Sequence, residues 1–361
     1  MKAFHYLLPM ACIALAACSS SEVTEDPETQ GTAITFDTHM WKNSRALSNA
    51  NFKQFYVYGT YRVSESTVPV QVFGGDAVNY NKDTDTWTYS SADRYWNPKG
   101  TYDFYAYSCE NTTLGNANGS ASFHNTSTES HLDITDYLIS STHCTHDLVY
   151  AKLTEQAGSA HTSATSSTPV ALDFKHLLTR VKFTIESEFP DNNNRVTISN
   201  VTLRNFRDKG DFHGNDLEWV NVEHSNASDQ PAIVVKSEAT VIQENATHTT
   251  LETDPVYMIP FKYAEANVYL QFEVNVQAKD TNGAWEDVLG QTIIAHWAPN
   301  WEMGKSLNNH IKLNSSASGL EKITFTAKIV PDGPDTDSDG WSDFGDGGLS
   351  GLGFEVAGRG N

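Results

Sequence analysis

Five aspartates near the C-terminus have the spacing of a calcium-binding loop. In the segment 335–346 they stand at loop positions 1, 3, 5, 9 and 12, and Gly340 stands at position 6. They are Asp335, Asp337, Asp339, Asp343 and Asp346. Carboxylate oxygens at these positions wrap one Ca²⁺ ion, and the glycine permits the sharp turn of the loop. The last position of such loops commonly holds a longer glutamate, so an acidic, solvated tail without an ion is the alternative.

A cysteine near the N-terminus has the sequence context for covalent lipidation. A positive start precedes the apolar segment 6–15, which is too short to span a bilayer and is typical of an export signal. The motif Leu15-Ala16-Ala17-Cys18 then matches the lipobox of bacterial lipoproteins, in which the cysteine thiol accepts a diacylglyceryl group. We therefore expect a signal peptide over 1–17, palmitate-type acylation at Cys18 that anchors the protein in the outer membrane, and a flexible tether over 18–31.

The other cysteines that remain after export are Cys109 and Cys144. An even number of cysteines in an oxidising compartment permits a disulfide. Two unpaired, buried thiols fit the sequence equally well, because sequence does not show whether the two side chains meet.

The remaining reactive residue types form no recognisable catalytic motif. His143 and His146 flank Cys144, but zinc needs four convergent ligands and no second ligand pair is nearby. His176 has the character of a packed or hydrogen-bonded residue at the end of a strand. The sequence contains no nucleophile elbow, Cys/His protease signature or phosphate-binding glycine loop. We therefore expect no enzymatic activity, and no cofactor apart from the calcium considered above.

Composition indicates a folded protein that does not bind nucleic acid. The 361 residues suit about two domains. The 17 Phe, 15 Tyr and 8 Trp favour pleated strands over helices or disorder. The formal net charge of −21 repels nucleic acid.

The elements that must position these residues are predicted to be strands. Short runs that alternate apolar with polar residues recur about every ten residues, for example at 52–63 and 102–107. No stretch of useful length has the period of a helix. The polar segment 110–130 predicts a long loop. The sequence thus predicts an all-β protein of β-sandwich type.

A segment poor in apolar residues, 158–169, is the predicted boundary between two domains. We expect an N-terminal β-sandwich over 32–157 and a C-terminal β-sandwich over 170–330. An acidic, Gly-rich tail follows over 331–361.

Five further features occur in a characteristic order. They are the lipobox followed by Ile34-Thr35-Phe36 and Ser44-Arg45-Ala46; Trp87-Thr88-Tyr89 before Tyr95-Trp96-Asn97-Pro98 and 102–107; Asp147 to Ala151; Leu172 to Phe183; and Gly304-Lys305-Ser306 before Ile311-Lys312-Leu313. In this order the chain resembles the fimbrillin family of Gram-negative gut and oral anaerobes. The resemblance covers most of the chain after the lipobox, although Leu307-Asn308-Asn309 stand where the family often has tyrosines.

The resemblance implies two tandem transthyretin-like β-sandwich domains and a lipoprotein precursor of a surface fimbria, or pilus. It also implies that an arginine-directed protease removes the N-terminal strand, and that a strand from the next subunit fills the groove. Arg45-Ala46 is the candidate cleavage bond, and a solvated loop arginine is the alternative for Arg45. The tail segment 349–356 is a candidate donor strand or, alternatively, a disordered end.

The expected partners are other fimbrial subunits, the outer membrane through the lipid, and a host glycan or protein receptor. The family plan is shared by shaft, tip and anchor subunits, and the sequence does not distinguish them. The main alternative is a non-polymerising surface lipoprotein that binds a glycan or host protein. A hydrolase whose site has no sequence motif is a third.

Overall fold

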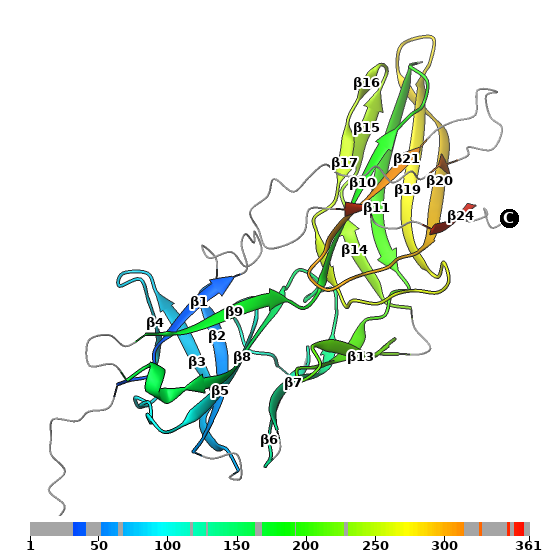
Figure 1. The fold of residues 1–361 in the computed structure, drawn as a ribbon. Helices are drawn as coiled ribbons and strands as arrows, with labels where there is room; N and C mark the ends of the chain where they lie inside the picture. Colours follow the sequence, from blue (N-terminus) through cyan, green and yellow to red (C-terminus); the bar gives the residue numbers. More distant parts are fainter. Residues whose placement is uncertain are drawn as a thin grey trace, which may run out of the picture. The chain divides into compact units, whose positions relative to one another are not determined.

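The computed structural model describes residues 32–40, 52–63, 68–115, 118–127, 129–162, 168–191, 193–226 and 230–313, together with the backbone of three short strands between 325 and 356. Apart from turns and loops, these residues form β-strands, which confirms the predicted all-β fold (Figure 1). A single 3₁₀ turn, η1 (Gly158–Ala160), stands between strands of the described part. Residues 1–31, including Cys18, and the Arg45-Ala46 bond lie outside the described residues.

The first sheet closes on itself as a barrel in the order β1-β4-β3-β2-β5-β8-β9. Its strands are β1 (Phe36–Met40), β2 (Gln54–Arg62), β3 (Val70–Asn81), β4 (Thr86–Tyr89), β5 (Thr101–Cys109), β8 (Leu148–Ala157) and β9 (Val170–His176). Strand β2 shows the alternation that drives these segments into a sheet. Phe55 and Val57 are fully buried, whereas Tyr56 and Tyr58, which alternate with them, are partly exposed. The aromatic residues noted in the sequence form the core of this sheet.

Strand β9 belongs to this first sheet, although its sequence predicts a strand at the start of the second sandwich. It pairs with β1 in parallel and with β8 in antiparallel fashion. Val170, Leu172 and Phe174 alternate into the first core, so burial of this face determines where the strand lies. Contacts join Thr32–Asn361 into one unit, and the division into two sandwiches therefore stays a prediction.

Two further sheets follow β9. The first has β17 (Thr250–Glu252), β10 (Thr179–Ser187), β21 (Ser306–Leu313) and β22 (Phe325–Thr326) in that order, with β18 (Val256–Met258) on β10 and β23 (Gly345–Asp346) on β21. Strand β21 begins at Ser306, two residues after Gly304, whose φ of +69° is a backbone conformation that favours glycine. The Arg180 Nε donates a hydrogen bond to the buried Ser306 Oγ at 2.9 Å, which fixes the parallel pairing of β10 and β21.

The other sheet is built around the long hairpin of β19 and β20. Its order is β16 (Thr247–His248), β15 (Thr240–Glu244), β11 (Asn194–Arg204), β19 (Val268–Lys279), β20 (Trp285–Ala298) and β24 (Ser350–Val356), with β14 (Ala232–Lys236) also on β11. One face of β19, including Leu270 and Phe272, is fully buried. The large second core includes the buried faces of this sheet and of that of β10, and it continues to buried residues of β5 and β8.

A small fourth sheet has the order β13-β12-β7-β6, made of β13 (Glu218–Glu223), β12 (Lys209–His213), β7 (Ser130–Leu138) and β6 (Ser120–Asn125). The expectation of one long loop over 110–130 is therefore wrong, because β6 lies within it. Its polar sequence gives no strand signal of its own, and pairing with the more apolar β7 forms the strand.

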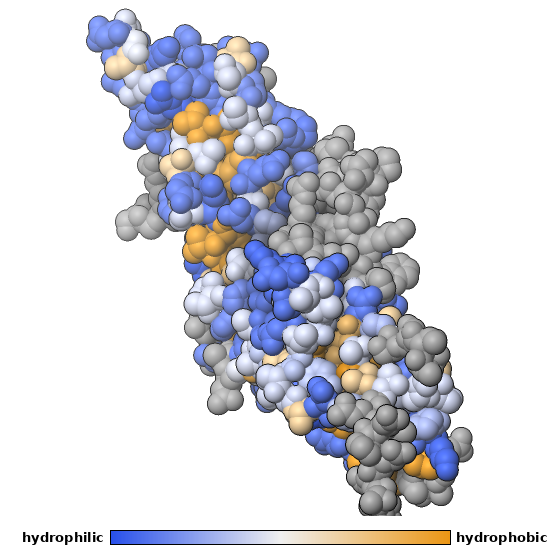
Figure 2. Space-filling model, turned by 90° about the vertical axis from the view of Figure 1, so that its left-hand side faces the viewer, coloured by the Kyte–Doolittle hydropathy of each residue, from blue (hydrophilic) through white to orange (hydrophobic). Residues whose placement is uncertain are grey.

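The face of the molecule drawn in Figure 2 agrees with the polar composition. Figure 2 shows a largely hydrophilic face on which hydrophobic residues form small separate patches. No helix among the described residues has the length and apolar character needed to cross a membrane.

Candidate functional site

The segment 32–40 closes the first barrel from the N-terminal side (Figure 1). Strand β1 pairs in parallel with β9 at five positions, from Phe36 opposite Val170 to Met40 opposite Phe174. On its other side it pairs with β4 at one position, Phe36 opposite Trp87. This terminal segment is therefore inserted between two strands that come later in the chain.

Backbone hydrogen bonds before β1 extend this insertion. The Ile34 N–H donates to the carbonyl oxygen of Arg94 at 2.7 Å, and the Trp96 N–H donates to that of Thr32 at 2.9 Å. On the opposite side the Val170 N–H donates to the carbonyl oxygen of Thr35 at 2.8 Å. If the segment left, the partner groups on both sides would lose their hydrogen bonds.

Two side chains of this segment reach the centre of the aromatic core. Ile34 is fully buried and Phe36 is 3% exposed. The Phe36 ring lies edge-on to those of Phe73 and Phe55, with ring centroids 5.3 and 5.9 Å apart. Burial of each side chain contributes about 1.5–3 kcal/mol, and each aromatic pair adds about 0.5–1.5 kcal/mol. Loss of the segment would thus open a long apolar groove.

Strand β9 depends on β1 for most of its pairing within the barrel. Its pairing with β8 has only two positions, Val149 opposite His176 and Tyr150 opposite Lys175. A replacement strand lying along β9 would therefore restore five pairs and cover Leu172 and Phe174 again.

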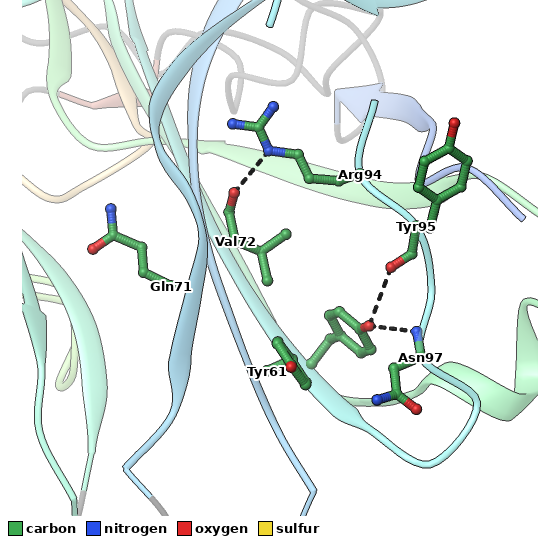
Figure 3. A pocket seen from close by; sticks show the side chains of 7 residues that line it. Tyr61, Gln71, Val72, Arg94, Tyr95 and Asn97 are labelled. Carbon is green, nitrogen blue, oxygen red and sulfur yellow. Dashed lines mark hydrogen bonds between the residues drawn. The ribbon is translucent and has the colours of Figure 1, made fainter. Parts of the chain in front are cut away.

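A pocket of about 340 Å³ lies beside residues 94–96, which form backbone hydrogen bonds with residues 32–34 (Figure 3). The residues that line it are Tyr61, Gln71, Val72, Arg94, Tyr95, Asn97 and Tyr102. The rings of Tyr61 and Tyr102 stack with centroids 5.4 Å apart. The Arg94 Nε donates to the carbonyl oxygen of Val72 at 2.9 Å, and the Asn97 N–H donates to the Tyr102 hydroxyl at 2.6 Å. Aromatic faces beside polar groups suit a sugar ring, although these polar groups already have partners within the chain.

The two cysteines predicted as a disulfide or as unpaired thiols are both free and buried. Burial, with a smaller contribution from the charges of Asp147 and Glu110, raises the pKa of the Cys109 thiol to about 12. Burial also raises the pKa of Cys144. Both thiols are therefore protonated and unreactive at neutral pH.

Of the predicted calcium residues, Asp335, Asp337, Asp339 and Asp343 lie outside the described residues. Asp346 is described only as part of the backbone of β23, where it pairs with Asn308. The calcium site therefore stays a prediction.

His176 ends β9 as a buried, hydrogen-bonded residue, as expected from the sequence. Its Nδ1 lies 2.7 Å from Oδ2 of Asp147, and both side chains are buried. His143 and His146 lie with ring centroids 5.3 Å apart in the turn that holds Cys144, and no third ligand from the described residues joins them.

The C-terminal strand β24 occupies the edge of the sheet of β20. It pairs with β20 in antiparallel fashion, from Ile293 opposite Val356 to Ala298 opposite Ser350. In the sequence Leu352, Phe354 and Val356 alternate with smaller or polar residues. This is the same alternation with which Ile34 and Phe36 fill the groove of the first barrel.

Comparison with known proteins gives a family and a fold. The model of a family described as fimbrillin-like matches residues 44–331. A fimbrial protein from Bacteroides vulgatus has a similar solved structure, with a TM-score of 0.61, 15% identity, and coverage of 82% of this chain and 98% of that chain. A solved structure from Bacteroides ovatus, described as that of a candidate cell adhesion protein, matches with a TM-score of 0.43, 15% identity, and coverage of 84% of this chain and 100% of the other. A comparison with curated protein sequences found no match.

Proposed function

The chain belongs to the fimbrillin-like family, and on that premise we propose that it is a structural subunit or accessory component of a surface fimbria that serves adhesion. Its subunits join by donor-strand exchange, a form of β-augmentation in which one chain completes the sheet of the next. The single observation that supports this most directly is the insertion of segment 32–40 between β4 and β9. A terminal strand is the part of a barrel that one cut can release.

Release would follow cleavage between Arg45 and Ala46, a bond that lies five residues after the end of β1. A protein cut there keeps β9 and the aromatic core but loses Ile34 and Phe36. The exposed groove would have unpaired backbone groups and an apolar lining. A new strand that binds there would form hydrogen bonds with these groups and remove the apolar surface from water. Contacts of this head-to-tail kind do not close on themselves and produce filaments.

We propose the C-terminal strand β24 as the donor. It stands at a sheet edge, so it can leave without breaking pairs between other strands. Export and anchoring of the precursor would use the signal peptide and the acylated Cys18, which places the chain at the cell surface before it is cut.

The test is cleavage of the purified precursor, without residues 1–18, by an arginine-specific protease. We expect the wild-type chain to lose the residues before Ala46 and to form filaments visible by negative-stain microscopy. The Arg45→Ala variant should stay monomeric, whereas Lys42→Ala, a change of a nearby cation, should polymerise like the wild type. Filaments from Arg45→Ala would contradict the processing site, and a chain that begins at Ala46 but stays monomeric would contradict strand exchange.

The pocket in Figure 3 supports a second candidate function, capture of a glycan by a non-polymerising surface lipoprotein. Stacked tyrosines beside Arg94 and Asn97 are the residue types that bind sugars. Binding of the uncut monomer to a glycan array, lost in Tyr61→Ala and without any filament formation, would favour this function over assembly.

A further inference from the structure

The hairpin of β6 and β7 places two histidines and an aspartate on one face. His124 stands directly opposite His131 in the antiparallel pairing, and Asp133 follows His131 by two residues. Because side chains alternate along a strand, residues two apart point to the same side. Residues seven and two positions apart in sequence thus become immediate neighbours.

The ligand atoms of these three side chains converge. Oδ2 of Asp133 lies 3.4 Å from Nε2 of His124 and 3.6 Å from Nε2 of His131. All three ligand atoms lie within 4.8 Å of one another. The two imidazole rings stack with their centroids 4.6 Å apart.

These separations suit a metal ion better than direct hydrogen bonds. A good N–H···O hydrogen bond has a length of about 2.7–3.2 Å, which is shorter than both distances. Two ligands bound to a tetrahedral zinc ion at about 2.0–2.1 Å from it lie roughly 3.3–3.5 Å from each other. The spacing of the carboxylate oxygen from the two nitrogens is close to this value.

The carboxylate is held in the orientation that such a site needs. The Gly214 N–H donates to Oδ1 of Asp133 at 2.9 Å, which leaves Oδ2 toward the imidazoles. A Cβ at position 214 would lie 1.9 Å from the carbonyl oxygen of Leu132, so a glycine is required for this approach. Glu129 Oε1 lies 3.8 Å from Nδ1 of His131, which is too far for a hydrogen bond.

We propose that His124, His131 and Asp133 bind one zinc ion or a similar late divalent metal, with water as the fourth ligand. Two imidazoles favour such metals over Ca²⁺ and Mg²⁺, which prefer oxygen ligands. The side chain of His124 is 47% exposed, whereas those of His131 and Asp133 are 15% and 14% exposed. The open side of the site is therefore the side of His124, where metal and water can enter.

Metal binding would join the edge strand β6 to β7 through side chains as well as through the backbone. This site is far in sequence from the segment 32–40 and does not depend on cleavage or polymerisation. Absence of metal binding and absence of filament formation are therefore separate experimental outcomes.

The experiment is titration of the purified uncut protein with Co²⁺, followed by visible absorption, and with Zn²⁺, followed by calorimetry. We expect one ion per chain, and we expect His124→Asn and Asp133→Asn to lower the Zn²⁺ affinity by more than about tenfold. His124 is half exposed, so its replacement tests the site without disturbing the core. His146→Asn, which alters the other close pair of histidines, is the matched control and should leave the affinity unchanged.

A second readout is thermal unfolding with and without Zn²⁺. Zinc should raise the midpoint of the wild type and of His146→Asn, but not that of His124→Asn, because ligands that bind only the folded state stabilise it. The proposal is overturned if the wild type binds no Zn²⁺, or if His124→Asn and Asp133→Asn bind it as tightly as the wild type. In that case the cluster is a metal-free group of ionisable side chains.

Discussion

Glu110, directly after β5, is a half-buried carboxyl group beside the buried Asp147. The backbone N–H of Asp147 donates a hydrogen bond to Oε2 of Glu110 at 3.1 Å. Burial, and to a smaller extent the charge of Asp147, raises the pKa of Glu110 from 4.5 to about 7. The folded chain therefore keeps this proton over a pH range in which the unfolded chain has lost it.

The sign of the resulting pH dependence follows from that raised pKa. The stabilising contribution of Glu110 protonation is fully present below about pH 4.5 and is lost as the pH rises toward 7. The free energy of unfolding of the wild type should therefore decrease as the pH rises. In Glu110→Gln, which has no ionisable group at this position, we expect this decrease to be smaller by on the order of 1–2 kcal/mol, a figure that allows for the solvent that reaches the side chain. Urea unfolding at pH 5 and pH 8 measures it, with the exposed Glu238→Gln as control. Equal losses of stability in the wild type and in Glu110→Gln would contradict the prediction.

Residue chemistry was only partly predictable from the sequence. The packed, hydrogen-bonded character of His176 was expected, but its partner Asp147 was not, because 29 residues separate them in the chain. The cluster of His124, His131 and Asp133 was missed because the segment 110–130, which holds His124, was interpreted as a loop. The signal that could have revealed it is the alternation of His131 with Asp133, which places both on one face of a strand.

At the scale of elements, strand β1 is the part of the structure on which assembly would depend. A synthetic peptide with the sequence of residues 32–40 should bind the protein that begins at Ala46 and prevent it from polymerising. The peptide restores the pairs with β9 and returns Ile34 and Phe36 to the core. Light scattering after cleavage measures the effect.

The control for this peptide has Phe36 replaced by Asp, which keeps the backbone pairing but places a charge among Phe55, Phe73 and Phe104. It should not inhibit polymerisation. Filament growth at the same rate with either peptide would show that the β1 groove is not the site of exchange.

The sequence predicted strands correctly where apolar and polar residues alternate. It did not predict strands whose existence or place in a sheet depends on pairing with a distant partner strand. Gly304-Lys305-Ser306 before β21 was noted only through the resemblance, because the residues that follow, Leu307-Asn308-Asn309, are not an apolar run. Strand β6 has few apolar residues and exists through its partner β7. The assignment of β9 to the first barrel depends on contacts with Phe36 and β1, which are more than 100 residues earlier in the chain.

At the scale of the whole molecule, filament formation requires both a groove and a donor. A chain that ends at Leu349 lacks β24, so after cleavage it should stay monomeric or act as a filament terminator. A chain that ends at Val356 keeps the strand and should polymerise. Sedimentation and electron microscopy distinguish these outcomes, and polymerisation of the shorter chain would exclude β24 as the donor.

The parallel alignment of β10 with β21 has a mechanical consequence. Eight consecutive residues of β10, from Arg180 to Ser187, face Ser306 to Leu313 of β21. Force that pulls two such strands lengthwise past each other loads all of their hydrogen bonds at once, whereas peeling breaks them one at a time. In the proposed filament the donor strand of the next subunit pairs with β9. Strand β9 is connected to β10 through Leu177 and Leu178. Tension along a fibre in flowing liquid would then be carried by this ladder in shear, the direction in which a sheet resists rupture best.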